Sequence, residues 1–289
     1  MISGKPTQTI LQEFSHDRIK KRLIKTENNI YLRETGITGQ DDKVIPSMVD
    51  KFKQINRYVE IISHTLENLQ KNTDFTVIDM GAGKGYLTFA LYDYLNNTLN
   101  VNAQVTGVEM RDELVNKCNL IAEKAEFTNL RFVCANINDF QPGNTDMLIA
   151  LHACDTATDD AIARGISANA RYIVVAPCCH KQIRKEMSAD NVLEPMLKHG
   201  VFMERQAEMV TESLRSLYLE LFGYQTKVFE FISNEHTPKN VMITAVKTSR
   251  KVDEQRILNK IHQIKAFFGI GKYYLETLLH DNHFHSEMD

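Results

Sequence analysis

Three glycines crowd into five positions directly after an apolar run in V-I-D-M-G-A-G-K-G-Y-L, residues 77–87. Glycine lets the backbone turn sharply and lie close to a ligand. The pattern is not a phosphate-binding P-loop, because Lys84 is followed by glycine rather than Ser or Thr, and it is not the dinucleotide fingerprint, whose third glycine position holds Tyr86. Asp79 offers a carboxylate to a cationic ammonium group. The turn therefore predicts binding of the methionine moiety of S-adenosylmethionine; a tight strand-to-helix turn without a ligand is the alternative.

Two later strand ends supply groups for the rest of this cofactor. Glu109 ends V-T-G-V-E-M, where a carboxylate can accept both ribose hydroxyls. The segment A-N-I-N-D-F follows a third strand, so that Asn136 or Asp139 can receive the adenine amino group and Ile137 can pack on its ring. The residues predicted to bind the cofactor are Asp79, Gly81, Ala82, Gly83, Gly85, Tyr86, Glu109, Met110, Asn136, Ile137 and Leu151.

The elements that position these residues alternate between short β-branched runs and helical patterns, which is typical of βα units in a parallel sheet. Five such strands are expected at residues 75–79, 104–109, 130–134, 146–151 and 172–176. Two more, K-V-F-E-F-I and V-M-I-T-A-V, are joined by a loop too short for a crossover helix and must form an antiparallel hairpin. The predicted fold is α/β, a seven-stranded Rossmann-like sheet with helices on both faces.

Helical segments flank this sheet. An apolar stripe from Met48 to Leu69 predicts an amphipathic helix with Ser47 as its cap. Further helices are expected over residues 86–95, before a stop at Gly223, and in the tail after Ser249. The predicted domains are a helical N-terminal extension (1–70), a methyltransferase domain (71–248) and a C-terminal helical extension (249–289).

Reactive side chains follow the fourth and fifth strands, in L-H-A-C-D-T-A-T-D-D and A-P-C-C-H-K. Ligands of open α/β sheets lie at the carboxyl ends of the strands, so these residues are expected to face the transferable methyl group. His152 is the first candidate for a general base and Asp155 the second. Alternatively, His152 is a structural histidine, and Asp155 or Thr156 caps the next helix.

The cysteines at these strand ends permit three interpretations. Cys154 with Cys178 or Cys179 could add to a pyrimidine ring before methylation of carbon 5. His152, Cys154, Cys179 and His180 could instead hold zinc, or the cysteines could be small residues that pack a crowded turn. Adjacent cysteines on a strand end are expected to point in different directions, which disfavours the first two. No metal is assigned, and the candidate catalytic residues are His152, Cys154, Asp155, Cys179 and His180.

The segments D-M-G-A-G-K-G-Y-L, H-A-C-D-T-A-T-D and C-C-H resemble those of a class I methyltransferase family. This family includes the eukaryotic tRNA ribose 2'-O-methyltransferase and the methyltransferase part of a glutathione-S-transferase-like protein. The resemblance covers residues 71–247 and departs from the family at Leu151 and Asp155, where lysine and glycine are expected. It implies the seven-stranded fold, S-adenosylmethionine as methyl donor and RNA as the substrate class.

Composition limits where such a protein would act. The sequence shows no signal peptide and no apolar run of membrane-spanning length, and its five cysteines lack the spacing of a disulfide framework. We expect a cytoplasmic enzyme with reduced thiols, no membrane contact and no obligate protein partner.

The substrate partner predicted from the sequence is RNA; the alternatives are a protein or small-molecule methyltransferase and a scaffold that binds S-adenosylmethionine without catalysis. A net charge of −3 argues against an extended nucleic-acid surface but allows a local one. The basic run Arg18, Lys20, Lys21, Arg22 and Lys25 could bind phosphates, or it could be a solvated helix face. The loop between the last two strands offers three further candidate substrate contacts, His236, Lys239 and Asn240.

Overall fold

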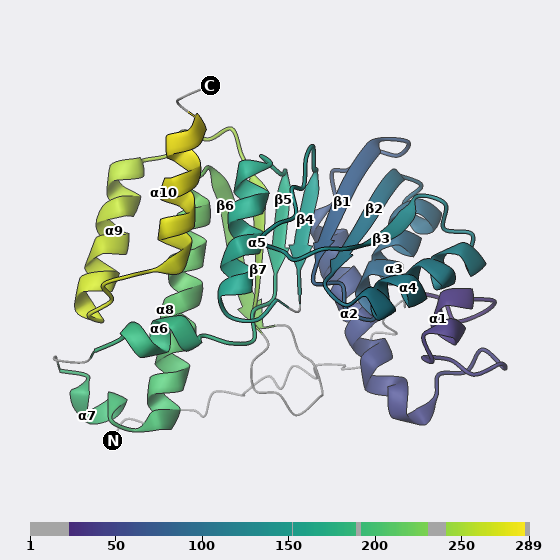
Figure 1. Cartoon of the computed structure of the whole chain (residues 1–289), viewed down its shortest axis with the longest axis horizontal. Coiled ribbons are helices and arrows are strands. Elements are labelled where there is room, and N and C mark those ends of the chain that lie inside the picture. The colour runs from purple at the N-terminus through teal and green to yellow at the C-terminus, as the bar shows by residue number, and fades with distance from the viewer. Residues whose placement is uncertain (1–22, 152, 189–191, 231–240, 287–289) are drawn as a thin grey trace, which may run out of the picture.

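A single twisted sheet organises the chain, and the computed structural model describes it over residues 23–151, 153–188, 192–230 and 241–286 (Figure 1). Its seven strands lie in the order β3-β2-β1-β4-β5-β7-β6. They are β1 (Asp74–Met80), β2 (Asn102–Glu109), β3 (Leu130–Cys134), β4 (Met147–Ala150), β5 (Tyr172–Val175), β6 (Tyr224–Glu230) and β7 (Val241–Lys247). The first five run parallel, and β7 pairs antiparallel with both β5 and β6, which confirms the predicted fold class.

The strand order reverses beside β1. The chain proceeds outward from β1 to β2 and β3 and then returns to place β4 on the other side of β1. Such a switch point leaves a crevice at the carboxyl ends of the strands, because the loops on either side diverge. A ligand site is therefore expected beyond the ends of β1, β2 and β4.

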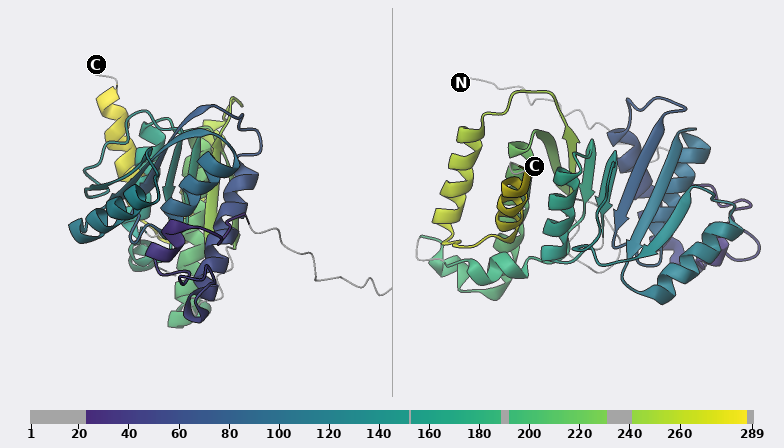
Figure 2. Two further views of the ribbon diagram at one scale, coloured as in Figure 1. Left: turned by 90° about the vertical axis from the view of Figure 1, so that its right-hand side faces the viewer. Right: turned by 45° about the horizontal axis from the view of Figure 1, so that its top comes forward.

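Helices cover both faces of the sheet (Figures 1 and 2). One face packs in a hydrophobic cluster with α1 (Ile30–Glu34), α2 (Val49–Thr65), α3 (Tyr86–Asp93) and α4 (Asp112–Lys124). The other face packs with α5 (Thr156–Ser167), α6 (Lys181–Glu186), α7 (Glu194–Leu197), α8 (Gly200–Leu221), α9 (Glu254–Phe267) and α10 (Tyr274–Ser286). β4 and β5 are apolar throughout because neighbouring residues serve opposite faces: Ile149 joins the first cluster and Leu148 the second.

Several local predictions need correction. Ser47 does not cap α2, because Pro46 starts a 3-10 turn over Pro46–Met48 and the cap position of α2 is Met48, without a side-chain bond. The helix expected over 86–95 ends at Asp93 and continues as a π-helical turn, Tyr94–Thr98. The fourth and fifth strands are each shorter than expected. Gly223 does stop α8, with a positive φ of 84°.

The predicted division into three domains stays a prediction. The flanking helices share the hydrophobic clusters of the sheet: α2 contacts α3, and α10 contacts α5. In the part of the chain that the structure describes, no helix has both the length and the apolar character needed to cross a membrane.

Candidate cofactor and acceptor site

A cavity of about 560 Å³ lies at the switch point of the sheet. It gathers every residue predicted to bind the cofactor except Gly85. The sequence did not predict a cofactor or catalytic role for the other lining residues, which come from α2, the glycine turn and α3, β2 and the cap of α4, the segment after β3, and the start of α5: Lys51, Lys84, Leu87, Val108, Arg111, Ala135, Asn138, Ala153, Thr156, Ala157 and Asp160. The segments that follow β1, β2, β3 and β4 thus meet around one volume.

The glycine turn owes its shape to backbone conformations that favour glycine. Gly81, Gly83 and Gly85 all have positive φ, at 81°, 59° and 74°. The N–H groups of Gly81 and Ala82 both donate to the carbonyl of Val108, each at 2.9 Å. The turn is thereby tied to β2 and exposes its backbone to the cavity.

Gly85 serves packing instead. It does not line the cavity, and a Cβ there would lie 2.8 Å from the ring of Phe89 and 3.1 Å from that of Phe132. The third glycine of the turn therefore allows α3 to approach the sheet. Its predicted contact with the cofactor is not supported by the geometry.

Asp79 is buried at the end of β1 and accepts a hydrogen bond from Thr88 Oγ1 at 2.5 Å. Burial raises the pKa of Asp79 to about 6, although the Thr88 hydroxyl opposes this shift. A carboxylate in this state favours a cation beside it, because an ammonium would offset the desolvation of the charge. The predicted role toward the cofactor ammonium suits this environment.

Glu109 is held in place by three groups of the same region. Its carboxylate accepts hydrogen bonds from Gly83 N at 2.9 Å, from Arg111 N at 3.1 Å and from Arg111 Nε at 2.9 Å. The hydrogen bond from the Arg111 side chain, aided by its charge, lowers the pKa of Glu109 although burial opposes it. The carboxylate is thus ionised and oriented toward the turn. Arg111 occupies part of the surface that the ribose hydroxyls are predicted to use.

The segment that is predicted to bind the adenine follows β3. Asn136 and Ile137 both line the cavity, whereas Asp139 does not, which favours Asn136 as the partner of the adenine amino group. Met110, 70% exposed, also contributes to the lining.

At the end of β4 only one candidate catalytic residue of the described chain lines the cavity, Cys154. His152 lies outside the described residues. Asp155 holds the cap position of α5 with φ 54°, but its side chain makes no cap bond there and instead accepts from Gln182 N at 3.2 Å. Asp155 therefore joins the segments after β4 and β5, which corrects the expectation that Asp155 or Thr156 caps α5; Thr156 is the first helical residue.

His180 belongs to a buried network of charges. Its Nε2 lies 2.7 Å from Glu212 Oε1, and Arg215 contacts the same oxygen at 3.0 Å and Asp159 Oδ1 at 2.8 Å. Burial alone would lower the pKa of Arg215, but the carboxylates of Asp159 and Glu212 raise it above its ordinary value. Arg215 also donates through Nη2 to the carbonyl of Asp155 at 2.9 Å. His180 does not line the cofactor cavity, so the geometry gives it a structural role and not the predicted catalytic one.

Sequence reasoning missed this network because its members lie on α5, at the cap position before α6, and on α8. The only local signal was the presence of Glu212 and Arg215 on the apolar face of α8, three residues apart. Charged residues at core positions imply a buried partner.

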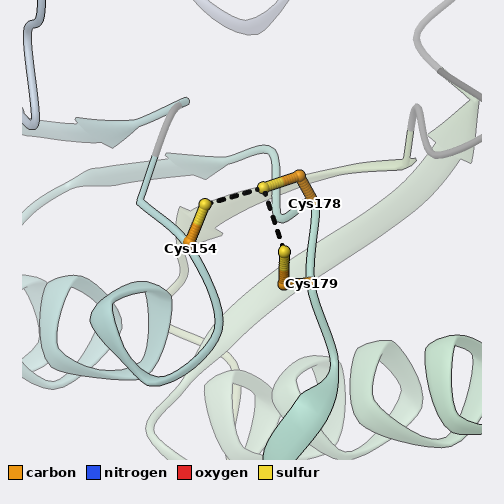
Figure 3. A group of neighbouring side chains, drawn as sticks. All are labelled: Cys154, Cys178 and Cys179. Carbon is orange, nitrogen blue, oxygen red and sulfur yellow. Dashed lines mark hydrogen bonds between the residues drawn. The ribbon is translucent and has the colours of Figure 1, made fainter.

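The three cysteines of the strand ends come together (Figure 3). Cys154 Sγ lies 3.0 Å from Cys178 Sγ, which lies 3.7 Å from Cys179 Sγ. The expectation that adjacent cysteines diverge is wrong, because residues 178 and 179 follow the end of β5 and do not have strand geometry. Burial, followed by the neighbouring thiols, raises the pKa of Cys178 to about 12, which disfavours this thiol as a free thiolate nucleophile.

The remaining candidate substrate contacts fall largely outside the described residues. This applies to His236, Lys239 and Asn240, and to Arg18, Lys20, Lys21 and Arg22 of the basic run. Lys25 is described and exposed.

Parts of this chain are similar to known proteins. Residues 50–186 match the family model described as a methyltransferase domain. The human glutathione S-transferase C-terminal domain-containing protein is 24% identical over 220 residues, 68% of this chain and 33% of its own length. Its Xenopus laevis counterpart is 28% identical over 132 residues, 46% of this chain and 20% of its own length. The chain spans about a third of the length of the first of these relatives.

Among solved structures, magnesium protoporphyrin IX methyltransferase from Synechocystis with bound S-adenosylmethionine has 16% identity and a TM-score of 0.44, covering 75% of this chain and 89% of that one. The match to the domain model identifies residues 50–186 as a methyltransferase domain. It is a domain of the S-adenosylmethionine-dependent class, with S-adenosylmethionine as its cofactor. The buried carboxylate of Asp79, the glycine turn and the oriented carboxylate of Glu109 fit this cofactor.

Proposed function

We propose that the chain transfers the methyl group of S-adenosylmethionine to RNA. The observation that supports this proposal is the charge distribution of the cavity. Its three acidic side chains, Asp79, Glu109 and Asp160, are buried. Its exposed charged residues, Lys84 and Arg111, are cationic, and the charge of Arg111 is partly offset by Glu109. An anionic acceptor is therefore favoured at the cavity mouth.

An aromatic side chain lies among these cations. Lys51, from α2, places its ammonium 5.9 Å from the centre of the Tyr86 ring at the cavity wall. Proteins that bind single-stranded nucleic acid combine cations for the phosphates with aromatic rings on which bases stack. The resemblance of the strand-end motifs to the tRNA-modifying family supports the same substrate class.

Within this proposal, methyl transfer is an in-line displacement at the sulfonium carbon, and most of the rate enhancement comes from positioning. Asp79 binds the ammonium, Glu109 the ribose, and Asn136 with Ile137 the adenine. S-adenosylmethionine supplies the methyl electrophile. The acceptor then enters from the β4 side, beside Leu151 and Cys154.

A hydroxyl acceptor also needs a proton acceptor. His152 stays the first candidate, although it lies outside the described residues. Asp155 is a weaker one than predicted, because its carboxylate is engaged with Gln182. Asp160 replaces it: this carboxylate lines the cavity, accepts from Tyr274 Oη at 2.9 Å, and has a pKa raised by burial.

The test uses methyl-labelled S-adenosylmethionine and an extract of cells that lack the encoding gene, divided between nuclease and protease treatment. We expect the label to be lost only to nuclease, and nucleoside analysis then identifies the methylated atom. Label in protein or small molecules would contradict the RNA proposal. Binding of S-adenosylmethionine without any transfer would indicate a cofactor-binding scaffold.

A charge reversal tests the cationic mouth directly. Lys84→Glu is expected to weaken RNA methylation. It should also make RNA binding less sensitive to salt: the slope of log binding constant against log salt concentration should become shallower by about 0.7 to 0.9 for each phosphate that the variant no longer neutralises. Calorimetry with S-adenosylmethionine shows whether cofactor binding is retained. Lys251→Glu is the matched control, since Lys251 is exposed and does not line the cavity. Equal behaviour of both variants would remove the support for an anionic acceptor.

A further inference from the structure

Three thiols from two separate chain segments meet beside the cofactor cavity (Figure 3). Cys154 precedes α5, whereas Cys178 and Cys179 follow β5, and the three sulfur atoms all lie within 4.8 Å of one another. The other two cysteines, Cys118 and Cys134, are not part of this group.

The distances between the three sulfur atoms suit a single thiophilic cation. A zinc ion holds each thiolate at about 2.3 Å, which separates tetrahedral sulfur ligands by roughly 3.8 Å. The Cys178–Cys179 separation of 3.7 Å matches this value, and the Cys154–Cys178 separation of 3.0 Å needs to widen by less than about 1 Å. We propose that Cys154, Cys178 and Cys179 bind one zinc ion through three thiolates.

The surrounding contacts hold the two ligand segments together. Asp155, next to Cys154, accepts from Gln182 N through its side chain and from Arg215 Nη2 through its carbonyl. His180, next to Cys179, is fixed by Glu212 at 2.7 Å. Such supporting hydrogen bonds are what orient metal ligands in proteins. His180 itself is outside the group, so the ligand set differs from the one considered from the sequence.

A cation explains three thiols better than a disulfide does. A disulfide would join two of them and leave the third crowded against the pair. A zinc ion, by contrast, binds all three sulfur atoms as thiolates and releases their protons. Cys118 and Cys134 lie outside the group, so they serve as control thiols when the ligands are assigned.

Three protein ligands leave one tetrahedral position open. In zinc sites of this kind the fourth position holds water or substrate. Cys154 also lines the cofactor cavity, so the proposed ion lies at the cavity's β4 edge. This inference concerns metal binding alone and does not depend on the acceptor being RNA.

The first experiment is elemental analysis of the untagged full chain, purified without chelator and also after dialysis against zinc. We expect about one zinc per chain. Substitution by cobalt(II) is expected to give a thiolate-to-metal charge-transfer band and the strong visible bands of tetrahedral coordination.

Variants assign the ligands. Cys154→Ser, Cys178→Ser and Cys179→Ser are each expected to weaken zinc affinity by more than the roughly 10- to 100-fold that loss of a supporting hydrogen-bond partner costs. Cys134→Ser is the matched control, an exposed cysteine outside the group, and it should retain the full zinc content.

Three results would overturn the proposal. They are a zinc-free protein with five titratable thiols, a Cys154–Cys178 disulfide found by mass spectrometry, and undiminished zinc in the triple serine variant. The cobalt spectrum of the wild-type chain keeps the test valid if a variant fails to fold.

Discussion

The β1–β2 end of the cavity and its β4–β5 end are stabilised by different kinds of interaction. At the β1–β2 end, hydrogen bonds from backbone groups predominate: Gly81 and Ala82 donate to Val108, and Gly83 donates to Glu109. At the β4–β5 end, side-chain charges from another layer hold the loops, with Arg215 as the central group.

The difference follows from what each end must do. The β1–β2 end, where we propose that the cofactor binds, presents a fixed surface built by the local residues of a glycine turn. The β4–β5 end must fix two loops that have no strand pairing of their own. A buried ion network stabilises such loops only when every charge has its partner, because desolvation of an unpaired charge is large.

The largest effect is therefore expected from removing the central charge of the network. Arg215→Met leaves Asp159 and Glu212 buried without their cation, and we expect a loss of about 3 to 5 kcal/mol in the free energy of unfolding. Urea denaturation at neutral pH measures this change.

A surface ion pair provides the control for this prediction. Arg57 and Glu60 form a pair three residues apart on α2, with side chains 38% and 36% exposed. Arg57→Met should change the unfolding free energy by about 0.5 kcal/mol or less. Equal losses in the two variants would mean that the network contributes no more than a surface pair.

The contrast between local hydrogen bonds at one end and distant charges at the other also explains how much of the site could be predicted from the sequence. The glycine turn, Asp79 and Glu109 were predictable because a strand, a turn and a helix start lie within one short segment, and the parallel sheet then aligns the strand ends. Asp159 and Arg215 are 56 positions apart, and no local pattern pairs them. The position of the cysteines was also beyond the sequence, since strand alternation no longer applies after β5 ends.

The packing role of Gly85 was hidden for a related reason. The motif predicts a turn, and only the tertiary contact with Phe89 and Phe132 shows that the third glycine is needed for helix packing. How closely α3 approaches the turn depends on which side chains the folded structure places against Gly85.

A second prediction concerns the charge at the cofactor end. Burial raises the pKa of Asp79 to about 6, so between about pH 4 and 6 the folded chain binds more protons than the unfolded chain, and stability falls as pH rises through this interval. Asp79→Asn is expected to increase the unfolding free energy above pH 6 by up to about 3 kcal/mol. The same variant should lose affinity for S-adenosylmethionine.

The pH dependence of cofactor binding sharpens this prediction. Wild-type affinity should fall by about tenfold per pH unit below the pKa of Asp79, as calorimetry can measure, whereas Asp79→Asn should show no such dependence. Thr88→Val removes the hydroxyl that lowers this pKa, so the transition should move to higher pH. An unmoved transition would assign the pH dependence to another group.

The smallest expected effect is the difference in unfolding free energy between alanine variants at two glycines of the same turn. Gly85→Ala places a methyl group against Phe89 and Phe132 at positive φ, and we expect overpacking and the left-handed backbone together to reduce the unfolding free energy by about 2 to 4 kcal/mol, with the cavity lining otherwise retained. A Cβ at Gly83 meets only ordinary contacts at 4.0 Å, so Gly83→Ala should cost about 1 kcal/mol for its left-handed backbone.

The cofactor should reverse the order of these two variants. Gly83 lines the cavity and donates to Glu109, so Gly83→Ala is expected to weaken S-adenosylmethionine binding more than Gly85→Ala does. Thermal unfolding with and without saturating cofactor measures both quantities in one experiment, because ligand binding raises the unfolding midpoint by an amount that grows with its affinity. If Gly85→Ala proved the weaker binder at equal stability, the third glycine would contact the cofactor after all, and the packing role inferred from its neighbours would be wrong.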